Sequence, residues 1–285
     1  MMTALCSHPL TDAEIQAGMS GLPAVSTVMR RILGVLADPR SDLSDIARLV
    51  RAETSLAAQV VRMANSVFYG LGQPVRSIEE AIQRLGFAEV NRLVLTLNGR
   101  QLFQGPLGHV GLSVESVWQN ALAVAVCAET VAGYAQLDRG LAYLGGILHP
   151  VGLLVLDRVA AARQLPAREP GQTLAEWATA YFGDHHAAVS ARVLQAWALP
   201  EALVGTVAGR YEPAAAGEQR RSASGLHLAS CLAEHLGAGL AAEQGRFQVS
   251  AATLAAAGLE LDEFGEAEIA AGQGLQRTRA LLQLA

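Results

Sequence analysis

The sequence predicts an all-α protein. Alanine and leucine are abundant while aromatic residues make up only 5% of the chain, a composition that favours helices over sheets. Helix-start signals follow one another along the chain, and the apolar residues between them recur at helical spacing. No segment shows sustained alternation of apolar and polar residues between turn signals, which is the pattern of a half-buried strand. We therefore expect helices packed into two units.

The helix starts are marked by capping-box spacings. In a capping box, a hydroxyl side chain and a glutamate three residues later each satisfy a backbone amide of the other. This spacing occurs at 11–14, 77–80 and 173–176. Gly86 and Gly183 stand where the helices that begin after Ser77 and Thr173 are expected to end.

One long expected helix contains an alanine-rich apolar stripe. The stripe consists of Val117, Ala121, Leu122, Ala125 and Ala128. Small side chains at this spacing allow a helix to approach its neighbours closely, so we expect tight packing here.

A glycine-rich stretch divides the chain. Between Gly99 and Gly111 there are three further residues of glycine or proline, which favour loops over helices. We expect an N-terminal helical unit over 11–98 and a C-terminal helical unit over 112–285.

Composition and charge exclude several classes. With 21 basic and 26 acidic residues the net charge is −5, and no run of five lysines or arginines is present, so nucleic-acid binding is not expected. Cys6, Cys127 and Cys231 show no paired spacing, which predicts reduced thiols. No signal peptide is evident, and apolar stretches end before the ~20 residues of a membrane span. We expect a cytoplasmic protein without membrane insertion.

Ordered sequence blocks in the N-terminal unit carry a resemblance. They are Leu22-Pro23, Asp38-Pro39, Leu43–Ala47, Arg62–Gly70, Pro74–Ile78 and Ala81–Gly86. In this order they are similar to the HDOD family, the HD-related output domain. Asn65 is expected to tie the loop backbone to its helix end, with a ligand contact as the alternative.

The C-terminal unit resembles the degenerate HD half of the same family. The segment 193–200 matches the family's Leu-Leu-x-x-Trp-x-Leu-Pro, and His186 ends a matching Gly-x-x-His. Intact HD hydrolases bring together a first His, a His-Asp pair, further His residues and a late Asp. These groups hold divalent metal, which activates a water for attack.

The resemblance places few metal ligands in this chain. Proline follows His149 where the paired aspartate would stand, and proline has no donor atom for a metal. His186 is retained. The vestigial positions are Asn120, His149, His186, Arg210, Tyr211 and Ser230, where Asn120 replaces the first His, Arg210-Tyr211 the His pair and Ser230 the late Asp. We therefore expect no catalytic residue, no bound metal and no cofactor.

The resemblance implies a non-catalytic scaffold, a pseudoenzyme in bacterial signal transduction. Its expected partners are a histidine kinase, a response regulator or a cyclic-dinucleotide enzyme. Candidate interaction or pocket residues are Asn65, Tyr69, Asn120, His149, His186 and Arg210.

Two alternatives stay open. The first is a metal-dependent phosphohydrolase, which requires Asp157, Asp184 or Glu176 to converge on the two histidines. The second is a nucleotide-binding sensor that uses the residual HD-type pocket. Asp184 is otherwise expected to be an N-cap.

Overall fold

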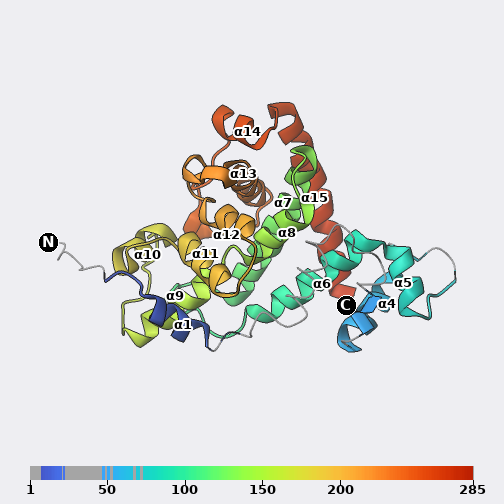
Figure 1. The fold of residues 1–285 in the computed structure, drawn as a ribbon, viewed down its shortest axis with the longest axis horizontal. Helices are drawn as coiled ribbons and strands as arrows, with labels where there is room; N and C mark the ends of the chain where they lie inside the picture. The colour runs from blue at the N-terminus through green and yellow to red at the C-terminus, as the bar shows by residue number, and fades with distance from the viewer. Residues whose placement is uncertain are drawn as a thin grey trace. The chain divides into compact units, whose positions relative to one another are not determined.

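The structure, a computed structural model, describes residues 8–20, 22, 47–48, 50–51, 54–66, 69–70 and 73–284. Within these ranges every regular element is a helix, which confirms the all-α fold class (Figure 1). The α-helices are α1 (Asp12–Met19), α4 (Thr54–Ala64), α5 (Ile78–Leu85), α6 (Phe87–Leu102), α7 (Val114–Tyr134), α8 (Arg139–Leu148), α9 (Val151–Ala162), α10 (Leu174–Phe182), α11 (His186–Ala196), α12 (Glu201–Ala208), α13 (Arg220–His235), α14 (Ala251–Ala257) and α15 (Leu261–Leu284). Short 3-10 helices are η1 (Pro213–Ala215), η2 (Gly217–Gln219) and η3 (Ala241–Glu243).

The chain divides into two compact units. The larger unit contains the described residues up to Leu22 together with 102–272, and the smaller contains those of 23–101 together with 273–284. One break falls at the end of α6, beside the glycine-rich stretch where a boundary was expected. Two segments differ from the expected division, because α1 belongs to the larger unit and the last turns of α15 to the smaller one.

An ion pair between Glu14 and Arg163 helps to hold α1 against the larger unit. Glu14 of α1 receives two hydrogen bonds from Arg163, which directly follows α9, and both are 2.7 Å long. The Arg163 hydrogen bond, partly opposed by burial, lowers the pKa of Glu14 to about 2. Such a two-pronged guanidinium–carboxylate contact fixes orientation as well as distance, so α1 is anchored to α9.

The core of the larger unit is built on α7. Nearly all of α7 from Val117 to Ala128 is buried, and α8 packs against it. The contact is so close that a Cβ atom at Gly146 of α8 would lie 2.2 Å from the Cα of Ala125. The tight packing expected of the alanine-rich stripe is therefore confirmed.

The expected helix ends are largely confirmed. Thr11 and Thr173 form complete capping boxes, and Gly183 ends α10 in the left-handed conformation with φ of 75°. Ser77 caps α5, but its box is incomplete because Glu80 accepts a hydrogen bond from the amide of Arg76 instead.

The segment 139–162 has the length and apolar composition that could cross a membrane, judged among the described residues alone. It comprises α8, α9 and the junction between them, and 83% of its most apolar window is buried inside the structure. These apolar side chains therefore serve as protein core here.

Candidate functional site

The junction of α8 and α9 supplies the first residue of the site. His149 is the C-cap of α8, and Pro150 follows as the N-cap of α9. The His149 side chain is fully buried, with Nδ1 lying 2.8 Å from the carbonyl oxygen of Gly146. Because a carbonyl only accepts hydrogen bonds, Nδ1 carries the proton and Nε2 keeps a lone pair. That Nε2 has no hydrogen-bond partner among the described residues.

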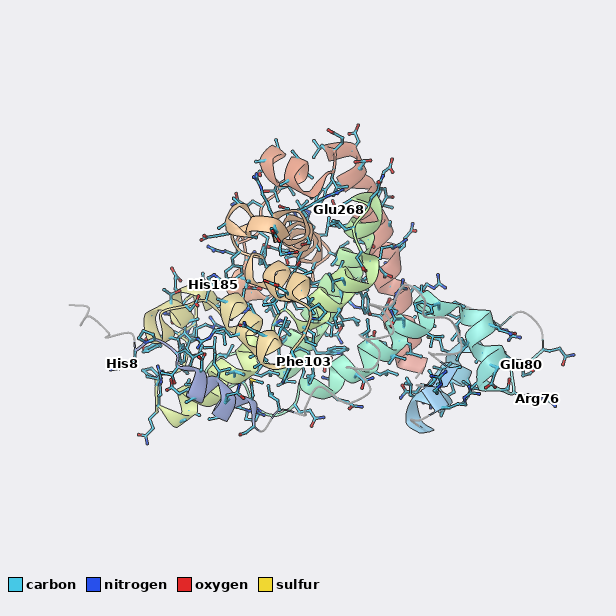
Figure 2. All side chains as sticks on the ribbon, in the orientation of Figure 1. His8, Arg76, Glu80, Phe103, His185 and Glu268 are labelled. Carbon is cyan, nitrogen blue, oxygen red and sulfur yellow. The ribbon has the colours of Figure 1, made fainter. Side chains whose placement is uncertain are left out.

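The start of α11 supplies the second histidine. His185, labelled in Figure 2, is the N-cap of α11. Its Nδ1 accepts a hydrogen bond from the amide of Ala188 at 3.2 Å. The expectation that Asp184 caps this helix is therefore wrong. Asp184 instead accepts from the amide of His185 at 2.9 Å, which holds the turn before the helix. His186, the next residue, is fully buried.

A serine hydroxyl joins these two elements. Ser190 of α11 donates to the backbone carbonyl of His149 at 2.6 Å and accepts from the amide of Gly152 at 2.8 Å. Gly152 has no room for a side chain, since a Cβ there would lie 2.5 Å from the carbonyl oxygen of His186. The two histidine-bearing segments are thus held in backbone contact.

The centre of the site is a buried ion pair. Arg210 directs Nη2 to Glu243 Oε2 at 3.0 Å and Nη1 to Oε1 at 3.3 Å. Its Nε donates to Ser230 Oγ at 2.9 Å, and its guanidinium carbon lies 4.3 Å from the ring centre of Phe247. Arg210 is fully buried and Glu243 is 4% exposed, so the two opposite charges neutralise each other inside the protein.

Tyr211 and His186 complete the cluster. Tyr211 donates its hydroxyl proton to Glu243 Oε1. His186 Nε2 lies 2.8 Å from both Glu243 Oε1 and the Tyr211 oxygen. Since both neighbours have oxygen lone pairs, the His186 proton is assigned to Nε2. We call Arg210, Glu243, His186, Tyr211 and Ser230 the buried polar cluster.

The electrostatics follow from burial and the ion pair. Burial, followed by the charge of Arg210, lowers the pKa of His149 well below its usual value, so this ring is neutral. Burial raises the pKa of Glu243, but Arg210 and His186 outweigh it and hold the pKa well below the usual range. Burial, followed by the charge of Glu243, raises the pKa of Tyr211 well above its usual value. Within this environment Glu243 is ionised and Tyr211 is a proton donor.

The structure unites four of the six vestigial positions by hydrogen bonds: His186, Arg210, Tyr211 and Ser230. His149 is not hydrogen-bonded to them, although its pKa responds to Arg210 and Glu243. Asn120 is buried on α7 and donates to the carbonyl of Ala238 at 2.8 Å, outside the cluster.

The remaining candidates, Asn65 and Tyr69, lie in the smaller unit. The Asn65 side chain donates to the carbonyl of Val75 at 3.0 Å and accepts from its amide at 2.7 Å. Its expected role in tying the loop to the helix is confirmed. The guanidinium of Arg277 lies 4.8 Å from the ring centre of Tyr69, and burial followed by the charge of Glu89 raises the pKa of Tyr69 to about 12.

The carboxylates that a hydrolase would need are used elsewhere. Asp157 accepts from the amides of His109 and Val110 at 2.7 and 3.0 Å. Glu176 closes the capping box of α10, and Asp184 binds the amide of His185. The carboxylate that reaches His186 is Glu243, which sequence reasoning missed. It lies in the three-residue helix η3, where no motif marks it.

The cluster does not fit a divalent metal. Both oxygens of Glu243 are engaged by Arg210, and Oε1 is shared with Tyr211 and His186. A metal would have to displace a guanidinium that already neutralises the carboxylate. In the part of the chain that the structure describes, no group of three or more His, Cys, Asp or Glu is placed to hold a metal ion.

The family model for the HDOD domain matches residues 22–213. The chain belongs to the HDOD domain family. The resemblance inferred from the N-terminal blocks is thereby confirmed. The matched region includes His149, His186, Arg210 and Tyr211, whereas Ser230 and Glu243 follow it. The blocks within 23–46 lie outside the described residues.

Solved structures share the HDOD fold. An HDOD domain protein of unknown function from Geobacter sulfurreducens is 21% identical with a TM-score of 0.69, covering 92% of this chain and 97% of its own. A candidate signal transduction protein from Marinobacter aquaeolei VT8 is 24% identical with a TM-score of 0.72, covering 98% of this chain and 63% of its own. A candidate phosphohydrolase from Shewanella amazonensis SB2B is 23% identical with a TM-score of 0.67, covering 96% and 98%.

Among curated proteins, an uncharacterised protein of Treponema pallidum (strain Nichols) is 22% identical over 209 residues. The match covers 68% of this HDOD chain and only 38% of the Treponema protein, so the chain spans well under half of that relative's length.

Proposed function

We propose that this HDOD protein is a non-catalytic signalling scaffold that acts through protein partners in the cytoplasm. The partner class is a histidine kinase, a response regulator or a cyclic-dinucleotide enzyme. The name of the Marinobacter protein, a candidate signal transduction protein, supports this direction, while that of the Shewanella protein favours hydrolysis.

The ion pair between Arg210 and Glu243 carries the proposal. Metal-dependent hydrolysis needs carboxylates and imidazoles with lone pairs free to bind a cation. Here the position that the family resemblance gives to a histidine ligand holds a guanidinium, which is permanently charged and cannot bind a metal. In this proposal the Arg210 guanidinium takes the place of a divalent metal ion as the positive charge beside Glu243.

Metal content tests the non-catalytic part of the proposal. Untagged protein is measured by elemental analysis beside a His149→Ala/His186→Ala variant, with His235→Ala as the control for a half-exposed histidine. We expect far less than one Fe, Mn or Zn per chain in all three. Near-stoichiometric metal that is lost only in the double variant, together with nucleotide hydrolysis, would establish the hydrolase alternative instead.

The partner part needs a direct binding measurement. Proteins cross-linked to the tagged chain in the native bacterium are identified by mass spectrometry, and each is then purified and titrated against the chain. We expect a saturable complex with one of the three named partner classes. If binding is seen only for nucleotides and for no signalling protein, the scaffold role is wrong and the sensor alternative is favoured.

A further inference from the structure

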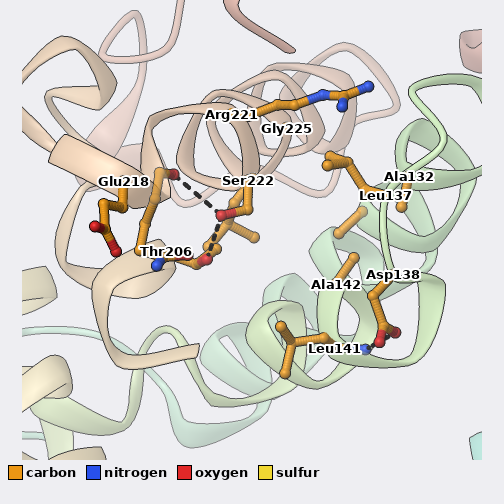
Figure 3. Close-up of a pocket in the computed structure, with 13 residues that line it drawn as sticks. Ala132, Leu137, Asp138, Leu141, Ala142, Thr206, Glu218, Arg221, Ser222 and Gly225 are labelled. Carbon is orange, nitrogen blue, oxygen red and sulfur yellow. Dashed lines mark hydrogen bonds between the residues drawn. The ribbon is translucent and has the colours of Figure 1, made fainter. Parts of the chain in front are cut away.

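A cavity in the larger unit shares no lining residue with the buried polar cluster. It has a volume of about 260 Å³ and lies where α7, α8, α12 and α13 meet (Figure 3). Pockets for drug-sized ligands are typically about 300–1,000 Å³. This cavity therefore suits a molecule smaller than a nucleotide.

Most of the cavity wall is apolar. It is lined by Ala128, Ala132, Leu137, Leu141, Ala142, Gly225 and Leu226. Among these, Ala128, Ala132, Gly225 and Leu226 are buried, and none of the seven side chains offers a hydrogen bond. A ligand that packs against this wall needs an apolar body, because the wall offers it no hydrogen bonds.

Two hydroxyl groups form a polar spot inside the cavity. Thr206 Oγ1 lies 2.6 Å from the carbonyl of Ala202 and 2.7 Å from Ser222 Oγ. Ser222 Oγ in turn donates to the carbonyl of Gln219 at 3.0 Å. Each hydroxyl has a single hydrogen, which these neighbours take up, while its oxygen keeps lone-pair capacity. The spot therefore accepts hydrogen bonds from a ligand.

Two carboxylates stand at the rim, on opposite sides of the opening in Figure 3. Asp138 caps α8 by accepting from the amide of Leu141 at 2.9 Å through one oxygen, which leaves its second oxygen available. Glu218 lies on η2 and is exposed. Carboxylates on both sides of the opening would repel a phosphate or carboxylate ligand.

The cation at the rim, Arg221, is held by other groups. Its Nη2 donates to the carbonyl of Ala135 at 2.7 Å and its Nε to that of Ala257 at 3.4 Å. In Figure 3 its side chain extends away from the Thr206–Ser222 pair. The cavity thus offers an apolar wall, acceptor oxygens, two carboxylates and the side-chain amide of Gln219, which can donate or accept a hydrogen bond.

We propose that this cavity binds a small protonated amine with an apolar body. The ammonium group lies at the rim, attracted by the Asp138 and Glu218 carboxylates, and the body fills the alanine- and leucine-lined wall. This site is separate from the vestigial HD site, so a ligand here would give the scaffold a sensory input without nucleotide binding.

The test is calorimetric titration with three probes of similar shape: 2-phenylethylamine, which is protonated at pH 7, neutral 2-phenylethanol and anionic phenylacetate. We expect the amine to bind at least about tenfold more tightly than the alcohol, since a charge-assisted hydrogen bond is worth roughly twice a neutral one. Phenylacetate should not bind.

Variants locate the site and its charge preference. Asp138→Asn keeps a good N-cap residue and, combined with Glu218→Gln, should remove the preference for the amine over the alcohol. Ala142→Phe should abolish binding of both by filling the cavity, and Glu201→Gln is the charge control outside it. Circular dichroism checks that every variant is folded. The proposal is overturned if the wild type binds none of the probes, if phenylacetate binds as well as the amine, or if Ala142→Phe leaves binding unchanged.

Discussion

Arg210 stands where the family resemblance expects a histidine, and its environment is unusual for so strongly charged a side chain. The Arg210 side chain is fully buried, and its guanidinium donates hydrogen bonds to the two carboxylate oxygens of Glu243 at 3.0 and 3.3 Å. Buried ion pairs of this kind contribute little net stability, but breaking one by removing a single partner is severe, because the other charge stays buried and unpaired.

We therefore predict strong non-additivity at this pair. Arg210→Met or Glu243→Gln alone should lower the free energy of unfolding by about 3–5 kcal/mol, while the double variant should lose much less than the sum. Urea denaturation measures all three. Asp12→Asn, which breaks the exposed pair of Asp12 with Arg192, is the control and should cost less than about 1 kcal/mol. Additive losses at Arg210 and Glu243 would show that the two are not coupled.

The lowered pKa values of His149 and Glu243 predict stability that falls with acidification. A group whose pKa is lowered by folding stabilises the protein above its unfolded pKa, and that contribution is lost as the pH decreases. The stability contributed by a histidine begins to fall near its unfolded pKa of about 6.5, and that contributed by a glutamate near about 4.3.

We expect the free energy of unfolding to decrease from pH 7 to pH 5.5. In His149→Gln the slope should be shallower by up to about 1.4 kcal/mol per pH unit. It should not vanish, because burial also lowers the pKa values of His185 and His227. Equal slopes in the two proteins would mean that His149 does not resist protonation.

The buried cysteines should react slowly with thiol reagents. Burial raises the pKa of Cys127 to about 12 and that of Cys231 to about 11, so little thiolate exists at pH 8. A Cys6→Ser variant isolates these two thiols. We expect slow reaction with a disulfide dye in the native state and rapid reaction of both in urea. Fast reaction of native Cys231 would contradict its burial.

At the scale of the helices, much of the arrangement could be predicted. Capping residues such as Thr11 and Thr173 act through neighbours three residues away, so the sequence contains the whole interaction. The role of His185 as an N-cap was missed because an aspartate precedes it and is the commoner cap. Glu243 was missed because its partner Arg210 is 33 residues away and only the fold brings them together.

The α7–α8 contact gives the sharpest prediction for an element. Gly146→Ala would place a methyl group 2.2 Å from the Cα of Ala125, a backbone atom that cannot move aside. We expect a loss of about 3 kcal/mol or more in the free energy of unfolding. Gly145→Ala is the matched control, since its Cβ would meet Leu203 at 3.5 Å, an ordinary contact. Its higher helix propensity should leave stability equal or slightly higher. Similar losses in both would refute the close approach.

At the scale of the whole chain, the division into units is discontinuous in sequence. The glycine-rich stretch marks one break, but no composition signal shows that α1 returns to the larger unit or that α15 passes from one unit to the other at Gly272. Within α15, Phe264, Ala267 and Ala271 are buried in the larger unit, while Thr278 and Leu281 are buried in the smaller one. A boundary drawn from the sequence assumes contiguous units, which is why it differs from the observed division for both segments.

The end of α15 should therefore support a unit that begins some 250 residues earlier in the chain. Thr278 and Leu281 line a small cavity together with Met63 and Leu93, and Arg277 lies over the ring of Tyr69.

Deleting residues 273–285 should speed amide hydrogen exchange across α5 and α6 by at least about tenfold, because buried contacts of the smaller unit are lost. Exchange in α7, α8 and α9, which belong to the larger unit, should stay unchanged. Arg277→Ala, which removes the guanidinium over the Tyr69 ring, should have a much smaller effect. Unchanged exchange in α5 and α6 after the deletion would show that the smaller unit folds without the end of α15.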